Sequence, residues 1–337
     1  MKAVSTYNEE ARKMNKADGL VYAHMLGSHL QQQILTWADV DAWRPEQGLL
    51  WIHLDAVNET ALDWLERKSG LNQLEKEALL ESGTRPRIAA TDRGAIVILR
   101  GVNCNPGAEP EDMVAVRMFI SNERIITMRR NRVMAIQDVH DDAQKGLGPA
   151  TPGAFFVSVA DRLSDRIGDV VADIEDRVAE VEDAIVSTET EELRPRLAEL
   201  RRESISLRRY VAPQRDILGR LTHERIDWLQ DSDRTHLREV AERTARFVED
   251  IDAARELALI AQEELNSRLS EQMNRAVYTL SIVAAIFLPL GLLTGLLGIN
   301  VGGIPGTDNP WAFPIVTGLI VVIAVVLVLW FKKIKWL

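Results

Sequence analysis

Two uncharged stretches near the end of the chain decide the fold: AVYTLSIVAAIFLPLGLLTGLL at residues 276–297, and WAFPIVTGLIVVIAVVLVLWF at residues 311–331. Each supplies the roughly 20 residues that a helix needs to cross about 30 Å of hydrocarbon. Buried helices of a soluble core normally carry a polar stripe, which the run from Val321 to Leu329 lacks. The two stretches therefore predict a membrane protein with two transmembrane helices, joined by a loop at residues 298–310.

The charges around these helices predict their orientation. Lys332, Lys333 and Lys335 follow the second stretch, whereas the loop carries only Asp308. Because cytoplasmic flanks are enriched in Lys and Arg, the basic tail at residues 332–337 is expected in the cytosol and the loop in the periplasm. No apolar signal segment follows Met1, so both termini are expected to be cytosolic, in the inner (cytoplasmic) membrane of a bacterium.

The composition excludes several classes of protein. The 337 residues carry a formal charge of -10, which argues against a nucleic-acid partner and favours cations. Cys104 is the only cysteine, so no intramolecular disulfide or structural thiolate zinc site can form, and we expect it to be a buried small hydrophobe rather than a metal ligand. The sequence contains no P-loop, no nucleotide-binding glycine fingerprint and no recognisable triad, so we expect no enzyme.

The first part of the chain, residues 1–150, alternates β-rich and helical segments and predicts a cytosolic α/β domain. Helices are expected at Glu59–Lys68 and Asn72–Glu81, and Asn122-Glu123 is expected to close a tight hairpin. The expected strands are Leu20–Met25, Leu49–Leu54, Ile88–Ala90, Ala95–Arg100, Met113–Ser121 and Arg124–Met128.

Residues 151–275 predict a cytosolic helical region and a stalk. Pro195 and Pro213 are expected to mark breaks between helices. An apolar seam with spacings of three and four then predicts packing against other helices; its members are Val240, Thr244, Phe247, Ile251, Ala254, Ala258, Ala261 and Leu265. No glycine or proline separates this seam from the first apolar stretch, so one helix is expected from about Thr235 to Leu297.

Residues 161–192 hold 12 Asp or Glu against three Arg. Two interpretations of this run are compatible: a solvated helix surface, or an acidic reservoir that concentrates cations near a pore. The run by itself names no metal ligand.

The first apolar stretch carries small and uncharged side chains on one helical face. Two helices cannot enclose a pore, so a conducting assembly would be an oligomer in which this face lines the axis. Gly291 and Gly295 alone would equally fit close helix packing without conduction. The residues at spacings of three and four are Asn274, Val277, Ser281, Ala284, Leu288, Gly291 and Gly295.

The run FLPLGLLTGLLGINVGGIPG, followed by a second span and the terminal FKKIKWL, resembles the CorA superfamily of metal-ion transporters. The hallmark of that superfamily is G-M-N at the end of the first of two C-terminal spans. This chain has Ile299 in place of the methionine and continues with VGGIPG, a variant similar to the ZntB-like zinc-transporter branch. The resemblance implies a homopentameric funnel with a long helical stalk that continues into the pore-lining span.

The resemblance also implies roles for individual residues. Gly298, Ile299 and Asn300 would form the selectivity filter at the entrance of the pore. Leu280 and Leu288 would be hydrophobic constrictions that gate by steric closure and dewetting. The positions that match pore-facing ones are Asn274, Leu280, Leu288, Gly291 and Gly295.

Polar groups suitable for metal ions are sparse around this path. Asn300 would supply neutral oxygen acceptors, which suit a hydrated ion, whereas bare Zn²⁺ needs His, Cys or carboxylate ligands. The last histidine is His236 and the last glutamate is Glu271, so the filter is expected to select a hydrated ion by size and dipole. Asp308 would either attract cations at the outer mouth or form an Asx-type turn.

Two groups in the cytosolic part combine histidine with acids: His140, Asp141 and Asp142, and His223 with Asp227. Each would be either a metal site or an ordinary set of surface groups.

These observations leave three hypotheses. The first is a homo-oligomeric transporter for Zn²⁺, with Cd²⁺, Ni²⁺ and Co²⁺ as further cargo, and with the proton coupling that the resemblance implies. The second is a CorA-like Mg²⁺/Co²⁺/Ni²⁺ channel driven by membrane potential. The third is a membrane-anchored sensor or scaffold without flux. The expected partners are divalent ions, lipid and further copies of the chain, and no resident cofactor is expected.

Overall fold

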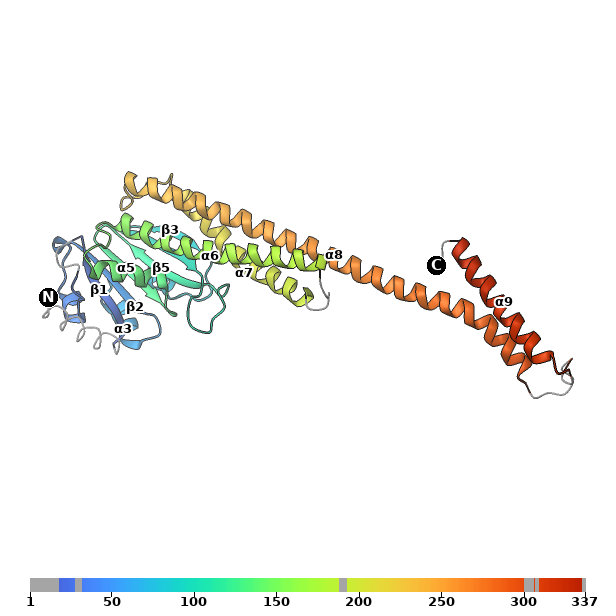
Figure 1. Ribbon diagram of the computed structural model, residues 1–337. Helices are drawn as coiled ribbons and strands as arrows, with labels where there is room; N and C mark the ends of the chain where they lie inside the picture. Colours follow the sequence, from blue (N-terminus) through green and yellow to red (C-terminus); the bar gives the residue numbers. More distant parts are fainter. Residues whose placement is uncertain (1–17, 28–31, 188–192, 300–305, 307–308, 335–337) are drawn as a thin grey trace. The chain divides into compact units, whose positions relative to one another are not determined.

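A computed structural model describes residues 18–27, 32–187, 193–299, 306 and 309–334. The chain divides into two compact units, residues 1–262 and residues 263–337. Six strands of the first unit form one sheet (Figure 1): β1 (Leu20–Leu26), β2 (Leu49–Asp55), β3 (Arg87–Thr91), β4 (Gly94–Gly101), β5 (Val114–Ile120) and β6 (Arg124–Arg129). All six strands expected from the sequence are confirmed, with ends that differ by a few residues.

The sheet is mixed, with the strand order β1-β2-β6-β5-β4-β3. Strands β2 and β6 pair in parallel, and the other neighbours pair antiparallel. The hairpin expected at Asn122-Glu123 is confirmed, because Ile120 pairs with Ile125 and the Ser121 N–H donates to the Arg124 carbonyl at 3.0 Å.

Short helices cover one face of this sheet: α2 (Trp37–Ala42), α3 (Glu59–Arg67) and α4 (Gln73–Leu80). Side chains alternate between the two faces of a strand, and Ile96 and Ile98 of β4 point to this one. They pack in a core with Trp64 and Leu65 of α3. The Asn58 side chain accepts from the first N–H groups of α3, and Asn72 does the same for α4, which explains where both helices begin.

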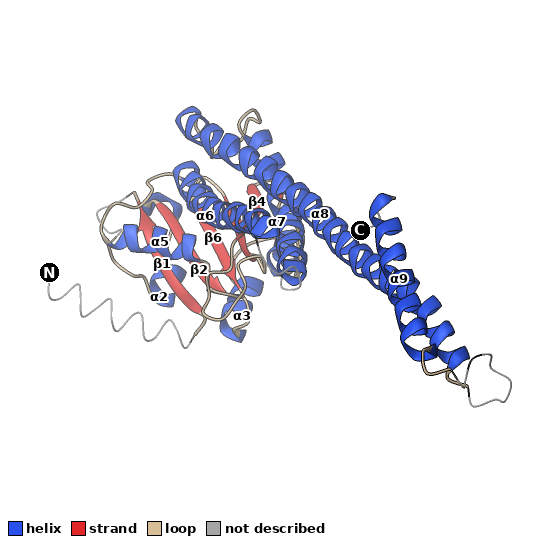
Figure 2. Ribbon diagram, turned by 45° about the vertical axis from the view of Figure 1, so that its right-hand side comes forward, coloured by secondary structure: helices blue, strands red, loops and turns tan. Residues whose placement is uncertain are grey.

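Longer helices cover the opposite face (Figure 2): α5 (Met134–Gln144), α6 (Pro152–Ser187), α7 (Leu193–Leu221) and the first turns of α8 (Asp231–Leu297). Val97 and Leu99 of β4 share a core with Phe155 and Phe156 of α6. The sheet and the helices after residue 150 therefore belong to one compact unit. Strands β1, β2, β4, β5 and β6 are buried on both faces, whereas the edge strand β3 is largely exposed, and we describe the fold as a three-layer α/β sandwich.

The break expected at Pro213 is wrong. Helix α7 continues through this residue, and only Pro195, in its first turn, lies near a helix end. Proline removes one helical hydrogen bond, but Val211, Gln214 and Ile217 are buried on either side of it. Packing against the sheet layer outweighs the loss of one bond.

The long helix expected from about Thr235 to Leu297 is confirmed as α8, which begins four residues earlier at Asp231. Most of the apolar seam on its first half is buried. Thr244 Oγ1 lies 3.1 Å from Ser164 Oγ of α6, and the Phe247 ring occupies the space that a side chain at Gly168 would need. Helix α9 (Ala312–Lys333) follows, and α8 and α9 are both long and apolar enough to cross a membrane.

A cluster of buried polar rings lies between the sheet and α5. His24 Nε2 of β1 is 2.7 Å from His140 Nδ1 of α5, and the Tyr22 ring stacks on His140 and on His53 with centroid distances of 3.9 and 4.9 Å. His24, His53 and His140 are almost fully buried. This cluster was not predicted, because no local motif relates His24 and His53 to His140, which follows 87 or more residues later in the chain.

Hydrogen bonds at Thr127 fix the tautomer of His53. The Thr127 hydroxyl donates to the Ile52 carbonyl, so its oxygen accepts from Trp51 Nε1 at 2.9 Å and from His53 Nδ1 at 2.8 Å. His53 Nε2 is then the unprotonated nitrogen, and it is buried without a partner among the described residues. Burial, then the charges of Arg129 and His140, lower the pKa of His53 well below 6.5.

This lowered pKa predicts a loss of stability in mild acid. Above pH 6.5 His53 is neutral in both the folded and the unfolded chain. Below it the unfolded chain binds a proton that the folded chain excludes, so the free energy of unfolding falls by up to about 1.4 kcal/mol per pH unit. His53→Asn keeps a donor for Thr127 and should make the pH dependence of the melting temperature shallower between pH 6.5 and 5.

The control is His223→Asn, which removes an exposed histidine outside the cluster. Its pH dependence should match that of the unmodified chain. An unchanged slope in His53→Asn would show that His53 does not carry this effect.

Candidate functional site

The last part of α8 passes from charged to apolar sequence within one turn. The pairs Arg268–Glu264 and Arg275–Glu271 lie one turn apart on the helix, with N···O distances of 2.7 and 2.6 Å. After Arg275 no charged residue follows within the helix. The expected start of the first span at residue 276 therefore coincides with the last charge of α8.

One face of this span packs against α9, which Figures 1 and 2 both show beside the last turns of α8. Ile282 of α8 and Phe331 of α9 are buried. The partly buried residues of the span repeat at helical spacing on the same face: Ala285, Ile286, Leu290 and Leu293. Helix α9 therefore covers one side of the span.

The residues expected to line a pore lie on the other side of α8. At about 100° per residue, their mean direction is roughly opposite to that of Ile282 and its neighbours. Leu280 and Leu288 are 69% and 78% exposed, and among the described residues no atom outside the adjacent backbone of α8 lies within 4 Å of a Cβ built at Gly291 or Gly295. We call this set the open face of α8: Asn274, Val277, Leu280, Ser281, Ala284, Leu288, Gly291 and Gly295.

An apolar groove is present in the open face. Ala284, Leu288 and Gly291 line it together with Phe287, Pro289 and Leu292. Pro289 has no N–H to donate to the carbonyl one turn before it, and Gly291 has no side chain, so backbone is accessible here. The hydroxyls of Ser281 and Thr294 donate to helix carbonyls one turn back, which leaves their oxygens as acceptors.

The charge distribution of the open face is compatible with a cation but provides no tight binding site for one. No carboxylate, histidine or cysteine belongs to the span, so it offers no strong ligand for a dehydrated metal ion. The peptide dipoles of α8 leave partial negative charge at its C-terminal end, near Leu297. The C-terminal end of α8 therefore favours positive charge, and the span itself offers only neutral oxygens and apolar groups.

The expected filter begins where α8 ends. The Gly298 N–H still donates to the Thr294 carbonyl at 2.9 Å, and a side chain at Gly298 would lie 3.1 Å from that oxygen. Ile299 is half exposed. Asn300 and Asp308 lie outside the described residues. The roles expected for all four stay predictions.

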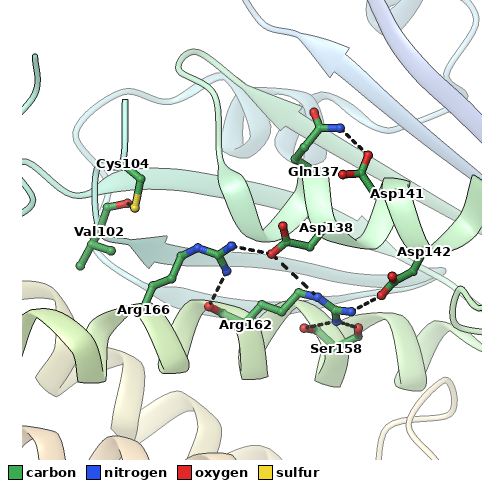
Figure 3. A network of polar contacts seen from close by, with 9 residues as sticks. All are labelled: Val102, Cys104, Gln137, Asp138, Asp141, Asp142, Ser158, Arg162 and Arg166. Carbon is green, nitrogen blue, oxygen red and sulfur yellow. Dashed lines mark hydrogen bonds and ion pairs between the residues drawn. The ribbon is translucent and has the colours of Figure 1, made fainter. Parts of the chain in front are cut away.

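The expected metal group in α5 is not brought together. Successive helical residues point in directions about 100° apart. His140 contacts the buried His24, Asp141 accepts from Gln137 at 2.8 Å, and Asp142 pairs with Arg162. Figure 3 shows Asp138 and Asp142 engaged by Arg162 and Arg166 of α6, which accounts for these acids as contacts between α5 and α6.

His223 and Asp227 are exposed between α7 and α8. Within the described ranges, no group of three or more His, Cys, Asp or Glu side chains has the geometry of a metal site. Neither set of residues therefore receives support as a metal centre from the structure, and Cys104, expected to be a buried small hydrophobe, is exposed.

Several carboxylates of the acidic run are paired with arginines. Arg243 of α8 contacts Asp161 and Asp165 at 2.5 and 3.2 Å, and Arg177 contacts Asp173 and Glu203. These pairs link α6 to α7 and α8. Burial, then the nearby Glu203, raises the pKa of Glu111, which borders the same acidic region.

Comparisons with known proteins agree with this architecture. Residues 46–333 match the model of the family described as CorA-like Mg²⁺ transporter protein. The zinc transport protein ZntB of Yersinia pestis is 34% identical over 328 residues, covering 97% of this chain and 99% of that protein. The divalent cation transporter CmaX of Pseudomonas aeruginosa is 38% identical over 328 residues, covering 95% and 97%.

Solved structures extend the likeness to three dimensions. The full-length CmaX protein matches with a TM-score of 0.81 and 35% identity, covering 95% of this chain and 98% of that one. The CorA magnesium transporter of Methanocaldococcus jannaschii matches with a TM-score of 0.78 at 20% identity, covering 94% and 98%, which shows the shared fold alone. The resemblance seen in the sequence is confirmed: the chain belongs to the CorA superfamily of transporter proteins, in the branch that contains ZntB and CmaX.

Proposed function

We propose that this chain transports Zn²⁺ and other divalent cations across a membrane, through a homo-oligomeric pore lined by the open face of α8. The observation that carries the proposal is the division of the span into two faces. Helix α9 covers the face around Ile282, whereas the face with Ser281, Ala284 and Gly291 is small, uncharged and exposed. An exposed face of this kind fits the axis of a ring of identical subunits.

The ring needs several copies, because two helices per chain cannot enclose a path. The pentamer implied by the family resemblance would place five open faces around the axis. Gly291 and Gly295 would then widen the path, while Leu280 and Leu288 would narrow it and close it to water. The C-terminal ends of five α8 helices would combine their partial negative charges at the mouth.

The cargo would pass as a hydrated ion. Removing water from Zn²⁺ requires replacement ligands, and none belongs to the open face. Gly298, Ile299 and Asn300 would therefore select by size and dipole, and Asp308 would attract cations outside the filter. Cd²⁺, Ni²⁺ and Co²⁺ are further cargo of similar charge. The proposal includes no resident cofactor and no enzymatic activity.

The proposed location is the bacterial inner membrane, with both termini in the cytosol. Lys332 and Lys333 lie in the last turn of α9, and such charges favour the cytosolic side. The α/β unit would then also be cytosolic.

The lack of strong zinc ligands in the span favours one alternative, a CorA-like Mg²⁺/Co²⁺/Ni²⁺ channel driven by membrane potential. Flux into proteoliposomes separates the two functions when ΔpH and voltage are imposed independently. We expect Zn²⁺ flux that increases with ΔpH. Mg²⁺ flux that depends on voltage alone would support the alternative, and no flux of any divalent ion would support a sensor or scaffold.

The same assay tests the filter. Asn300→Ala removes the amide oxygen and should reduce Zn²⁺ flux at low concentration, because the filter would lose its acceptors for the hydration shell. Asn309→Ala is the matched control in the same loop, where Asn309 Oδ1 accepts from the Trp311 N–H at 2.9 Å. Equal flux in Asn300→Ala and the unmodified chain would refute the filter assignment.

Cysteine modification tests the open face. In a Cys104→Ser background, Ala284→Cys should react with a water-soluble cationic thiol reagent and lose most of its flux, since a charge would then occupy an apolar constriction. Val325→Cys on α9 is the control, because Val325 is exposed in the chain but faces lipid in the proposed ring. Inhibition of both variants, or only of Val325→Cys, would contradict the arrangement.

A further inference from the structure

Two neighbouring cavities lie at one end of the sheet, where the β5–β6 turn meets the segments after α2 and α3. One has a volume of about 390 Å³ and the other about 450 Å³. Trp43 and Arg124 line both of them. Both belong to the α/β unit and involve none of the residues assigned to transport.

The cavities are rich in cationic side chains. Arg93 lines the first cavity, Arg44 and Lys68 line the second, and Arg124 lines both. The carboxylates in the two linings are Asp41 and Glu123, and Asp41 is already paired with Lys68 at 2.5 Å. Positive charge therefore exceeds negative charge around this space. We call the two cavities together the arginine pocket.

The three arginines are anchored by neutral groups. Arg124 Nη2 donates to the Ser69 carbonyl at 2.5 Å, Arg93 donates to the Gly70 carbonyl, and Arg44 Nη1 donates to the Trp43 carbonyl at 2.8 Å. Backbone carbonyls fix the positions of guanidinium groups but do not neutralise them. In the part of the chain that the structure describes, Arg44 and Arg124 form no ion pair.

Arg93 forms an ion pair with Glu75 at 3.7 Å. That carboxylate is buried and already accepts from the Asn72 N–H at 2.8 Å as part of the cap of α4. Burial, and then the positive charge of Arg93, lowers the pKa of Arg124, and the negative charges of Glu123 and Glu75 offset only part of this effect. The guanidinium groups of Arg93 and Arg124 thus repel each other in a partly dry site, and an anion between them would relieve that repulsion.

A fixed aromatic ring borders the same space. Trp43 is half-buried, and its Nε1 donates to the Gly48 carbonyl at 3.1 Å, which fixes the plane of the indole. A flat aromatic wall beside guanidinium groups is the combination that accommodates a base together with a phosphate. Each of the two cavities has a volume within the range of small-molecule sites.

We propose that the arginine pocket binds a nucleotide, with its phosphate on Arg93 and Arg124 and its base against Trp43. The guanidinium groups would bind phosphate oxygens with charge-assisted hydrogen bonds. Trp43 supplies the contact that distinguishes a nucleotide from inorganic phosphate. The site would make the α/β unit responsive to a soluble anionic metabolite.

The test is calorimetric titration of the full chain in detergent with AMP, ATP and inorganic phosphate, after removal of divalent metals with EDTA. Without metal, chelation by the nucleotide cannot imitate binding. We expect saturable binding of AMP and ATP, and binding of phosphate that is weaker by about tenfold or more, because stacking of a base on an aromatic ring contributes about that much affinity.

Three variants locate the site. Arg93→Gln changes an exposed side chain and should weaken nucleotide binding by about tenfold, the effect of losing one charge-assisted hydrogen bond. Trp43→Leu should weaken binding of AMP but not of phosphate. The matched control is Arg87→Gln on β3, an exposed arginine outside both cavities, which should bind nucleotide like the unmodified chain.

The absence of saturable nucleotide binding would overturn the proposal. So would equal losses in Arg93→Gln and Arg87→Gln, because a general charge effect would then explain the binding. Phosphate that binds as tightly as AMP, with Trp43→Leu unchanged, would refute the assignment of the base. Arg124→Lys keeps the charge but loses the planar fork, so it provides a second test if Arg93→Gln is poorly folded.

Discussion

The second unit depends on one constraint: every face of α8 must be in contact with another helix, lipid or water. In hydrocarbon each helix satisfies its own backbone hydrogen bonds, but a single neighbour covers only one face of it. Helix α9 contacts the face around Ile282 and leaves the opposite face open. The small residues of that face, Ala284, Gly291 and Gly295, leave room beside the backbone. Lipid can contact such a face, but lipid chains pack better against a face of bulky aliphatic side chains, such as that of α9. The small residues of the open face would allow the close contact with other copies of the chain that the proposed ring requires.

A different principle stabilises the first unit. All strands of its sheet except β3 are buried on both faces, so the polar groups inside it need internal partners. Thr127 accepts from Trp51 and His53, and His24 pairs with His140, which joins β1, β2, β6 and α5 in one polar network. The Arg162 and Arg166 contacts to Asp138 and Asp142 join α5 to α6. Apolar packing supplies most of the burial in this unit, and these directional contacts fix the position of α5 within it.

The parts predicted from the sequence are those that depend on local pattern. The length of the two uncharged stretches predicted both apolar helices, since α8 ends at Leu297 and α9 covers Ala312–Lys333. Alternation and turn residues located the strands and the Asn122-Glu123 hairpin. Features that depend on tertiary partners were missed. Pro213 lies within α7 because its neighbours are buried, and α5 is a short helix whose acids meet arginines 20 or more residues away. Likewise, the sequence grouped His140 with Asp141 and Asp142 as neighbours in the chain, whereas the helix separates their directions.

The chemistry of the path also limits where selectivity for zinc can arise. Zn²⁺ and Mg²⁺ carry the same charge, and a hydrated ion presents mainly water to the open face. Neutral oxygens and the leucine side chains around the proposed axis discriminate weakly between two such ions. The preference of Zn²⁺ for nitrogen and sulfur acts only in direct coordination. Strong discrimination therefore requires groups outside residues 276–297. The remaining places are the turn that begins at Gly298 and the α/β unit, where His24, His53 and His140 are buried and His223 and His236 are exposed. A transporter of this design would accept several divalent cations and obtain net preference from supply and regulation more than from the pore wall.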